Sequence, residues 1–377
     1  MSHVPFSSSP HGRLQLRQNQ FMVNRQFWQG KKVFLTGHTG FKGGWMAAWL
    51  HSLNADVTGY SLAPNTDPSF FEICRIGSRI DSHIGDIRDR EGVARAVAAA
   101  QPEIVFHMAA QPIVRRSYVE PVETMATNIM GTVHVLEAVR QSPGVRAVIV
   151  VTSDKCYDNR GLLRGYREDE AMGGRDPYSA SKGCTELVAA SYQHSFFRNG
   201  GLTVATARAG NVIGGGDWAD DRIMPDAIRA LGCGRPFGVR NPSSVRPWQH
   251  VLEPVCGYLM LAERVFTEQR VWEGGWNFGP SDDDAVPVST LSDLIVQSWG
   301  NGASWQNLSQ ADAPHEESHL KLDSTKARQT LGWHPRLNVG EAVRWTVDWY
   351  RQALAANSDD AMFTFTNEQF ARYDAIG

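Results

Sequence analysis

The sequence predicts a doubly wound α/β fold, in which helices cover both faces of a parallel sheet and a smaller part follows towards the C-terminus. The first observation is the apolar run 32–36, which leads through a glycine-rich turn into a helical pattern at 44–50. The second is a series of further apolar runs without polar alternation, at 56–60, 104–108, 147–152 and 202–207. The third is that helical patterns separate these runs, notably at 124–141 and 178–197. Strands of this kind are buried on both faces, as in parallel sheets.

The texture of the chain changes after Gly210, where a loop-rich stretch with several Arg, Pro and Trp begins. We therefore expect two domains. The first domain is predicted to bind a dinucleotide and comprises 28–213 with roughly 247–279. The second is predicted to bind the substrate and comprises 214–246 with 280–357. The remaining ends are expected to be a loose, polar extension at 1–27 and a tail at 358–377.

Composition excludes several classes of partner. The 377 residues include 37 basic and 40 acidic side chains, for a net charge of −3, which gives no reason to expect nucleic acid as a partner. No apolar run approaches the ~20 residues of a membrane span, so no membrane is expected either. The five cysteines are scattered without a C-x-x-C pair, which favours reduced thiols in the cytoplasm over disulfides or a metal site.

The glycine-rich turn after the first predicted strand carries Gly37, Gly40 and Gly43. Glycines let the backbone approach a pyrophosphate, and the helix that follows presents unpaired N–H groups and the positive end of its dipole. The context indicates the dinucleotide-binding turn of a Rossmann fold, against the alternative of a plain glycine-rich turn. We expect this turn to contact the cofactor through Gly37, Thr39, Gly40, Phe41, Lys42 and Gly43.

The choice of cofactor is less direct. An acidic residue that holds the adenosine ribose usually ends the second strand, but Tyr60 is followed by no acid until Asp67. Lys42 could attract the 2′-phosphate of NADP, so NADP stays open although NAD is preferred. Further along, the adenine is expected beside Asp86 and Ile87, and the cofactor is expected to lie over the small residues Ala109 and Ala110.

Tyr178 and Lys182 stand four residues apart, which places both on one face of a helix. Asp176 is expected to cap that helix and Pro177 to be its first residue. A nearby ammonium favours the phenolate form of a tyrosine, and a phenolate can take a proton from a sugar hydroxyl. The pair alone is weak evidence, because this spacing is common by chance.

Ser153, Asp154 and Lys155 end the strand at 147–152, at the carboxyl edge where ligands of such sheets bind. Ser153 can bond a substrate hydroxyl, and Asp154 and Lys155 offer an acid and a base side by side. An exposed ion pair in a loop is the alternative. The downstream Tyr178 and Lys182 favour a site that oxidises a hydroxyl.

Several polar residues are expected to bind the substrate. Arg240 and Arg246 can clamp the diphosphate of a nucleotide sugar by charge-assisted hydrogen bonds, although ordinary surface arginines are the alternative. The full set of expected substrate-binding residues is Gln111, Asn211, Asp217, Arg222, Arg240, Arg246 and His250.

Taken together, these motifs resemble the extended short-chain dehydrogenases/reductases that act on nucleotide sugars, over about 28–350. The resemblance is closest to the 4,6-dehydratases of CDP-glucose, and it rests on residues 37–43, 153–155, 209–218 and 246–254. Sister dehydratases of dTDP- or GDP-sugars carry Asp-Glu where this chain has Asp154-Lys155, and 4-epimerases lack the acid–base pair. That substitution is the feature that discriminates most within the family.

The resemblance implies a cycle with no net consumption of NAD. Tyr178 takes the proton of the glucose C4 hydroxyl while C4 gives hydride to NAD⁺. Ser153 bonds that hydroxyl, and Lys182 holds the ribose and favours the phenolate. Asp154 then protonates the departing C6 hydroxyl and Lys155 is the base at C5, after which the hydride returns to C6. A lysine must be neutral to act as a base, so an electrostatic role for Lys155 towards the enolate is the alternative.

The resemblance also implies a homodimer, or alternatively a tetramer, that pairs through the helices at 124–141 and 178–197. The expected pathway is deoxysugar supply for bacterial cell-surface polysaccharide, such as the O-antigen of lipopolysaccharide. Rival interpretations are a nucleotide-sugar 4-epimerase or reductase, a dehydratase of a dTDP-, UDP- or GDP-hexose, and a non-catalytic, redox-sensing NAD(P)-binding protein. Such sensors commonly lose the Tyr or the Lys, which this chain keeps.

Overall fold

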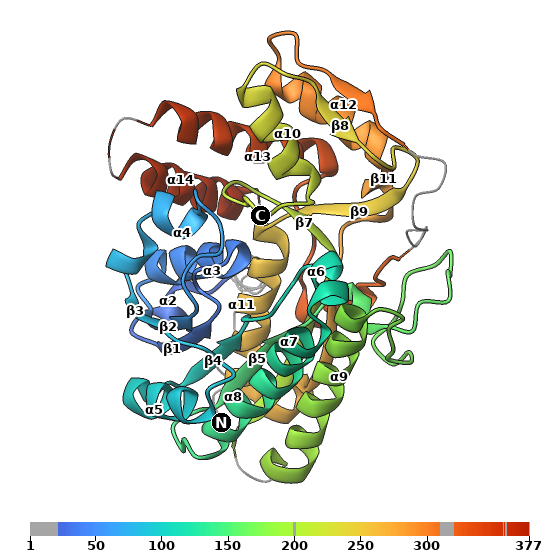
Figure 1. Cartoon of the computed structure of the whole chain (residues 1–377). Coiled ribbons are helices and arrows are strands. Elements are labelled where there is room, and N and C mark those ends of the chain that lie inside the picture. Colours follow the sequence, from blue (N-terminus) through green and yellow to red (C-terminus); the bar gives the residue numbers. More distant parts are fainter. Residues whose placement is uncertain (1–21, 199–200, 310–319, 357, 359, 377) are drawn as a thin grey trace, which may run out of the picture.

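A seven-stranded parallel sheet organises the larger part of the molecule (Figure 1). The computed structural model describes residues 22–376 except 199–200, 310–319, 357 and 359. The strand order is β10-β6-β5-β4-β1-β2-β3. The strands are β1 (Lys32–Thr36), β2 (Asp56–Ser61), β3 (Asp81–Ile84), β4 (Ile104–His107), β5 (Ala147–Val151), β6 (Thr203–Ala209) and β10 (Gly274–Phe278). The order reverses between β1 and β4, which is where ligands bind in doubly wound sheets.

Both faces of this sheet are buried, which confirms the doubly wound α/β prediction. In β1, Val33 and Leu35 pack in one hydrophobic cluster and Phe34 packs in the other. The first cluster includes residues of α3 (Phe41–Ser52), α11 (Leu252–Glu268) and α14 (Ala361–Ala375). The second includes residues of α5 (Arg90–Ala100), α8 (Gly131–Arg140) and α9 (Pro177–Tyr192). Successive strand side chains point to opposite faces, so an uninterrupted apolar run serves both layers.

Shorter helical segments connect these layers. They are α2 (Arg25–Trp28), α4 (Phe70–Ile73), η2 (Ile76–Ser78), α6 (Val114–Val119), α7 (Pro121–Met125), η3 (Ala126–Met130), η4 (Asp154–Cys156), η5 (Gln193–Phe197), η6 (Gln269–Trp272), η7 (Asp282–Asp284) and η8 (Ala327–Leu331). Segments α7, η3 and α8 follow one another and pack beside α9.

The smaller part contains two short sheets and its own apolar cluster (Figure 1). The strands are β7 (Asn211–Ile213), β8 (Phe237–Val239), β9 (Val245–His250), β11 (Ala285–Pro287) and β12 (Trp305–Asn307), in the orders β11-β9-β7 and β12-β8. The helices are α10 (Ile223–Gly232), α12 (Val288–Trp299) and α13 (Val339–Ala355). Strand β7 pairs with β9, so the chain leaves the large sheet after Ala209. The exact domain boundaries stay a prediction.

The C-terminal segment is a correction to the expected tail at 358–377. Residues 361–375 form α14, in which Phe370 stacks on Trp49 of α3 with ring centroids 5.2 Å apart. Tyr373 is wholly buried and donates its hydroxyl to Glu253 over 2.6 Å. A helix that buries two aromatic rings against α3 and α11 belongs to the core.

The N-terminal extension is only partly described, because residues 1–21 lie outside the described part of the chain. Residues 25–28 form α2, and Trp28 is wholly buried and donates its indole N–H to Glu263 over 2.7 Å. The backbone N–H of Asn24 donates to the same carboxylate over 2.8 Å. The chain is therefore already anchored to α11 before β1 begins. Among the described residues, no helix has both the length and the apolar character that crossing a membrane requires.

Candidate active site

The glycine turn lies between β1 and α3, as predicted, and β1 is next to the point where the strand order reverses. Gly37 has φ 83°, and a Cβ there would come within 2.7 Å of the backbone nitrogen of Ala109. A Cβ on Gly43 would lie 2.0 Å from the carbonyl oxygen of Gly37. Both positions exclude any larger residue. Gly40 is the N-cap residue of α3, whose first-turn N–H groups have no partner within the helix.

The other residues of the turn differ in their surroundings. Thr39 donates its hydroxyl to the carbonyl of Leu62 over 2.8 Å, which fixes the turn against the end of β2. Phe41 is half-buried at the start of α3. The pKa of Lys42 is lowered to about 8 by burial and by the charges of Arg222 and Lys182. Lys42 thus lies within electrostatic reach of Lys182 and Arg222.

The residues expected around the adenine end lie along the edge beyond β3 and β4. Asp86 accepts hydrogen bonds from the guanidinium of Arg88, including 2.6 Å from Nη2, and this pairing lowers the pKa of Asp86. Ile87 is buried, whereas Ala109 and Ala110 are half-buried after β4. Their contact with a cofactor stays a prediction.

Tyr178 and Lys182 occupy the first two turns of α9, and the predicted helix start is confirmed. Asp176 is the N-cap, with its carboxylate accepting from the backbone N–H of Ser179 over 2.9 Å, and Pro177 is the first helical residue. Lys182 donates its ammonium to the carbonyl of Val151 at the end of β5, over 3.3 Å. The helix therefore holds both side chains at the carboxyl edge of the sheet.

The protonation of the pair differs from the sequence expectation. Burial raises the pKa of Tyr178 to about 12, although the hydrogen bond with Ser153 opposes this rise. Burial also lowers the pKa of Lys182 to about 8, opposed by the carboxylate of Glu186. Desolvation is the largest cause of both shifts, so the phenolate that the spacing alone suggests is not favoured in the protein by itself.

Ser153, Asp154 and Lys155 follow β5 directly. The hydroxyl of Ser153 donates to the carboxylate of Asp154 over 2.8 Å and accepts from the backbone N–H of Lys155 over 3.2 Å. Ser153 and Asp154 are buried, whereas Lys155 is half-buried and lines a small cleft with Ser179 of α9. The structure thus brings Asp154 and Lys155 next to the first turn of the helix that carries Tyr178.

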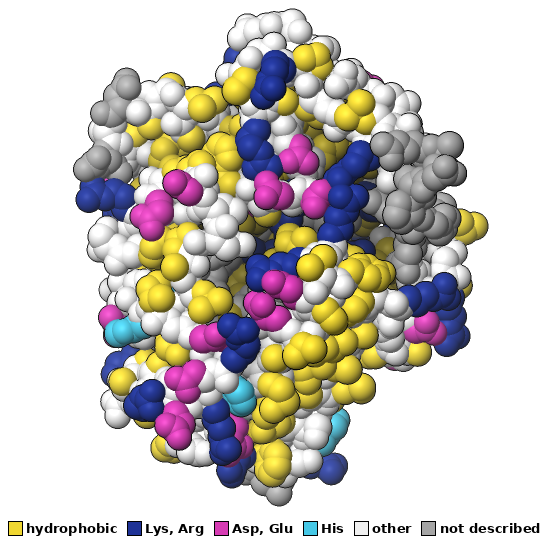
Figure 2. Space-filling model, in the orientation of Figure 1, with side chains coloured by type: hydrophobic (Ala, Val, Ile, Leu, Met, Phe, Trp, Pro, Cys, Tyr) yellow, Lys and Arg dark blue, Asp and Glu magenta, His cyan; other side chains and the backbone are white. Residues whose placement is uncertain are grey.

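A second pair of charges faces this group from the smaller part. Arg222 donates to the carboxylate of Asp217 over 2.9 Å, and the hydroxyl of Tyr350 donates to the carbonyl of Asp217 over 2.5 Å. The positive charge of Arg222 acts on both Lys42 and Tyr178. Figure 2 shows Lys and Arg side chains gathered around a hollow between the larger and smaller parts.

Arg240 shares a carboxylate with Arg115, an arginine that was not expected from the sequence. Asp221 accepts from Arg240 over 2.9 Å and from Arg115 of α6 over 3.0 Å. All three side chains are more than one-third exposed. Arg115 and Arg116 are adjacent in α6, and this pair of basic residues, in the segment that follows β4, was a signal that could have indicated Arg115.

The remaining expected substrate residues are more dispersed. Gln111 is buried, and its amide bonds the backbone of Ile113 and the hydroxyl of Thr124. Asn211 is half-buried in β7, and Arg246 donates to the carbonyl of Val245 over 3.0 Å.

His250 is wholly buried, between Trp45 and Trp345, with ring centroids 5.8 and 6.0 Å away. Burial lowers the pKa of His250 to about 3. The structure therefore places this neutral ring in the core and does not bring it to the charged group. In the described part of the chain, no cluster of three or more His, Cys, Asp or Glu side chains could hold a metal ion.

Comparison with known proteins decides the family. A family model described as GDP-mannose 4,6 dehydratase matches residues 34–346. The CDP-glucose 4,6-dehydratase of Salmonella typhimurium (strain LT2) is 53% identical over 335 residues, which cover 88% of this chain and 93% of that protein. The chain belongs to the CDP-glucose 4,6-dehydratase family.

Solved structures related to this CDP-glucose 4,6-dehydratase family member share its fold at low identity. The UDP-glucose 4-epimerase of Thermotoga maritima, solved with UDP-glucose, superposes with a TM-score of 0.73 at 23% identity, over 85% of this chain and 99% of that chain. A UDP-glucose 4-epimerase from Stenotrophomonas maltophila, with bound NAD and formylated UDP-arabinopyranose, gives 0.73 at 22% identity, over 86% and 100%. Both confirm the fold.

Proposed function

We propose that this chain catalyses the NAD-dependent dehydration of CDP-D-glucose to CDP-4-dehydro-6-deoxy-D-glucose, as a hydro-lyase. The observation that carries the proposal is the placement of Asp154 and Lys155 beside Ser153 and the first turn of the Tyr178 helix. An acid, a base and a redox tyrosine then share one edge of the sheet. The 53% identity to a CDP-glucose 4,6-dehydratase supports CDP-glucose over other nucleotide sugars.

NAD is the cofactor that we propose, and the glycine turn fits it. A Cβ at Gly37 or Gly43 would collide with backbone atoms, so the tight turn brings the N-terminus of α3 to the sheet edge. There the helix dipole and the first-turn N–H groups can bind a pyrophosphate. Bound NAD⁺ would accept hydride from C4 and later return it to C6.

The first half of the reaction falls to Tyr178, Ser153 and Lys182. Tyr178 takes the proton of the C4 hydroxyl as that carbon loses hydride, and Ser153 orients the hydroxyl. Lys182 holds the cofactor ribose. Because burial raises the pKa of Tyr178 to about 12 in the protein alone, the positive charges of Lys182, Arg222 and the bound cofactor must favour the phenolate during the reaction.

The second half falls to Asp154 and Lys155. The C4 ketone acidifies the C5 proton, which passes to the neutral amine of Lys155. Asp154, in its protonated form, donates a proton to the C6 hydroxyl as the C6–O bond breaks, and water leaves. When hydride adds to C6, Lys155 gives the C5 proton back to the sugar. The proton that Tyr178 took from the C4 hydroxyl then restores the acid form of Asp154 by way of Ser153. Ser153 links the residues of the two steps, because its hydroxyl forms hydrogen bonds with Asp154 and with Tyr178.

The substrate is proposed to lie in the hollow between the two parts. Arg240 and Arg246 would bind the diphosphate, and Asp217, Arg222, Asn211 and Gln111 the remaining polar groups. His250 supports the substrate side only by packing, because it is wholly buried between two tryptophans.

The substrate proposal is tested by incubating the enzyme with CDP-, dTDP-, UDP- and GDP-glucose and catalytic NAD, with mass spectrometry of the products. We expect loss of one water from CDP-glucose and little from the others. Water loss mainly from another nucleotide sugar would contradict the specificity, and an isomer of unchanged mass would indicate a 4-epimerase. Stoichiometric use of cofactor would indicate a reductase, and no product at all a binding protein.

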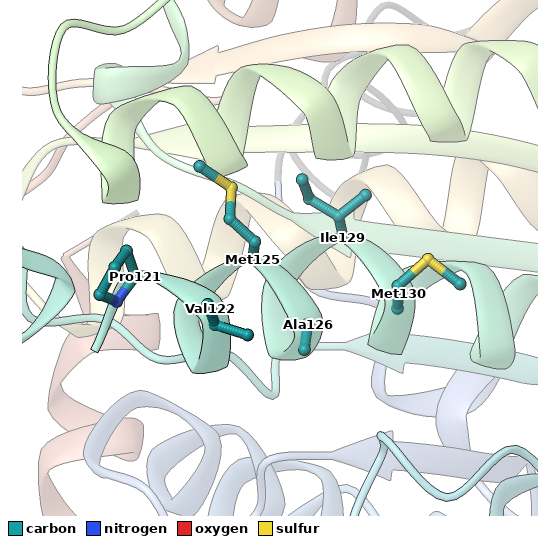
Figure 3. A pocket seen from close by; sticks show the side chains of 6 residues that line it. All are labelled: Pro121, Val122, Met125, Ala126, Ile129 and Met130. Atoms are coloured by element: carbon teal, nitrogen blue, oxygen red, sulfur yellow. The ribbon is translucent and has the colours of Figure 1, made fainter.

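We also propose a homodimer that pairs through α7, η3, α8 and α9. Large apolar side chains are exposed on these helices and just before them, and Figure 2 shows an apolar area over this region. Exposed apolar side chains here include Val119, Val122, Met130 and Leu187, and Phe196 of η5 continues the area after α9. Figure 3 shows Met125 and Ile129 pointing towards the neighbouring helix, whereas Val122 points away from it. An apolar face of this kind marks an interaction site.

Val122→Arg should convert the dimer to a monomer, because it places a charge at the centre of an apolar interface. Leu163→Arg is the matched control, since Leu163 is equally exposed (80% against 81%) but lies in the loop after η4. Sedimentation velocity measures both. A wild-type monomer, or a Val122→Arg variant that sediments like wild type, would exclude this interface.

A further inference from the structure

A buried ion pair lies beneath the candidate active site. Glu186 and Arg208 are 5% and 4% exposed, and they bond through both carboxylate oxygens, over 2.9 Å from Nε and 2.8 Å from Nη2. A two-pronged pair of this kind is geometrically specific. Burying a charge costs folding free energy unless each of its polar atoms has a hydrogen-bond or ionic partner. A role other than stabilising the fold is therefore considered for this pair.

The carboxylate of Glu186 joins the tyrosine helix to two strands. Glu186 stands four residues after Lys182, on the same face of α9. Its two oxygens also accept from the hydroxyls of Thr152 at the end of β5, over 2.5 Å, and Thr206 of β6, over 2.6 Å. Although burial would raise the pKa of Glu186, Arg208 and these hydroxyls hold it below its ordinary value.

The guanidinium of Arg208 contacts the segment that follows Thr152, at Tyr157. Its Nη1 donates to the hydroxyl of Tyr157 over 2.6 Å and to the carbonyl of Glu168 over 3.2 Å. Tyr157 in turn donates to Asn277 of β10 over 2.8 Å. Thr152 and Tyr157 are therefore both held by the ion pair, and the segment between them is Ser153-Asp154-Lys155-Cys156.

We infer that Glu186 and Arg208 are positioning residues that hold the acid–base segment in register with the redox pair, an inference that rests on the proposed dehydratase function. One buried ion pair binds both ends of the segment 153–156 and the helix that carries Tyr178 and Lys182. Oxidation at C4 and elimination at C5 and C6 require these groups to act on one sugar in sequence. The pair fixes their relative placement.

The pair also sets the charge around Lys182. Charged or titratable groups face this ammonium from four elements: Glu186 on α9 itself, Cys156 on η4, His107 on β4 and Lys42 on α3. Among these, burial keeps the pKa of Cys156 raised and that of His107 at about 3, so both are neutral at pH 7. Glu186 is thus the anion that stabilises the protonated form of Lys182.

The test uses Glu186→Gln and the double variant Glu186→Gln/Arg208→Gln. Glu186→Gln removes the anion and leaves Arg208 uncompensated, so the pKa of Lys182 falls. The alkaline limb of C4 oxidation should then move to lower pH by about one unit. The double variant removes the stranded charge and should move the limb less. A variant that only loosens the fold lowers the rate equally at every pH.

A second measurement compares how much of the 4-keto sugar is released before dehydration with how much is dehydrated. With the segment 153–156 released, we expect Glu186→Gln to discharge CDP-4-keto-glucose that has kept its C6 hydroxyl, at least about tenfold more than wild type by borodeuteride trapping. Glu253→Gln is the matched control. Glu253 of α11 is also a wholly buried carboxylate, and it accepts from the hydroxyl of Tyr373 of α14. Its replacement should move neither readout.

Thermal unfolding of each variant identifies those that fail to fold. An unshifted alkaline limb with unchanged partition, in a folded Glu186→Gln protein, would overturn the inference. The same result for Glu186→Gln and Glu253→Gln would do so as well. Failure of wild type to release water from CDP-glucose would overturn the proposed function instead, so the two outcomes are distinct.

Discussion

Lys155→Ala is expected to oxidise C4 of CDP-glucose but to stall before water is lost. The tyrosine, serine and second lysine that carry oxidation remain in place, because Lys182 is held by Val151 and Ser153 by Asp154. The base at C5 is missing, and loss of a general base costs about 10²–10⁴-fold in rate. A single-turnover experiment should show reduced cofactor absorbance that rises and persists, with dehydration slowed by that factor.

Lys155→Arg separates the two roles open to this residue. Arginine keeps the positive charge but cannot give up its proton in a protein. If Lys155 is the base, Lys155→Arg stalls like Lys155→Ala. If its role is electrostatic, the arginine should restore much of the dehydration rate. Arg160→Ala is the control for the surrounding loop, because the side chain of Arg160 is exposed and pairs with Asp158. Normal dehydration by Lys155→Ala would refute both roles.

Tyr178→Phe is expected to abolish the first step rather than the second. Without the phenolic oxygen nothing takes the C4 hydroxyl proton, so turnover should fall by about 10²–10⁴-fold and no reduced cofactor should appear. This distinguishes it from Lys155→Ala, in which reduced cofactor accumulates. The pH profile has a definite sign as well: the phenolate is the reactive form, so wild-type oxidation should rise with pH until Lys182, with its pKa of about 8, loses its proton.

Tyr118→Phe is the matched control for that substitution, since Tyr118 is 65% exposed on α6 and belongs to the same part of the molecule. It should keep the wild-type rate. Binding of NAD to Tyr178→Phe, followed by calorimetry, should be close to wild type, because the glycine turn is untouched. A Tyr178→Phe enzyme that still reduces cofactor would show that another residue is the base.

Features determined by local sequence could be predicted well. The run 32–36, the turn glycines and the cap Asp176-Pro177 each carry a signal within a few residues, and β1, Gly37 and α9 appear where expected. The placement of Ser153 at the end of β5 follows in the same way, because parallel strands end at one edge.

Features that depend on distant contacts could not be predicted. The C-terminal helix α14 has only a weak pattern of its own and is fixed by Phe370 stacking on Trp49. His250 reads as a polar ligand in the sequence, but the fold closes two tryptophans around it. Raised and lowered pKa values at Tyr178 and Lys182 arise from burial, which no spacing of residues reveals.

The most direct measurement of the central claim follows a deuterium label through wild-type turnover. CDP-glucose labelled at C4 is incubated with the enzyme and catalytic NAD, and the product is analysed by mass spectrometry and NMR. Internal return of hydride predicts CDP-4-dehydro-6-deoxyglucose with one water lost and the deuterium at C6. A product that keeps its C6 hydroxyl, or that loses water without deuterium at C6, would contradict the account.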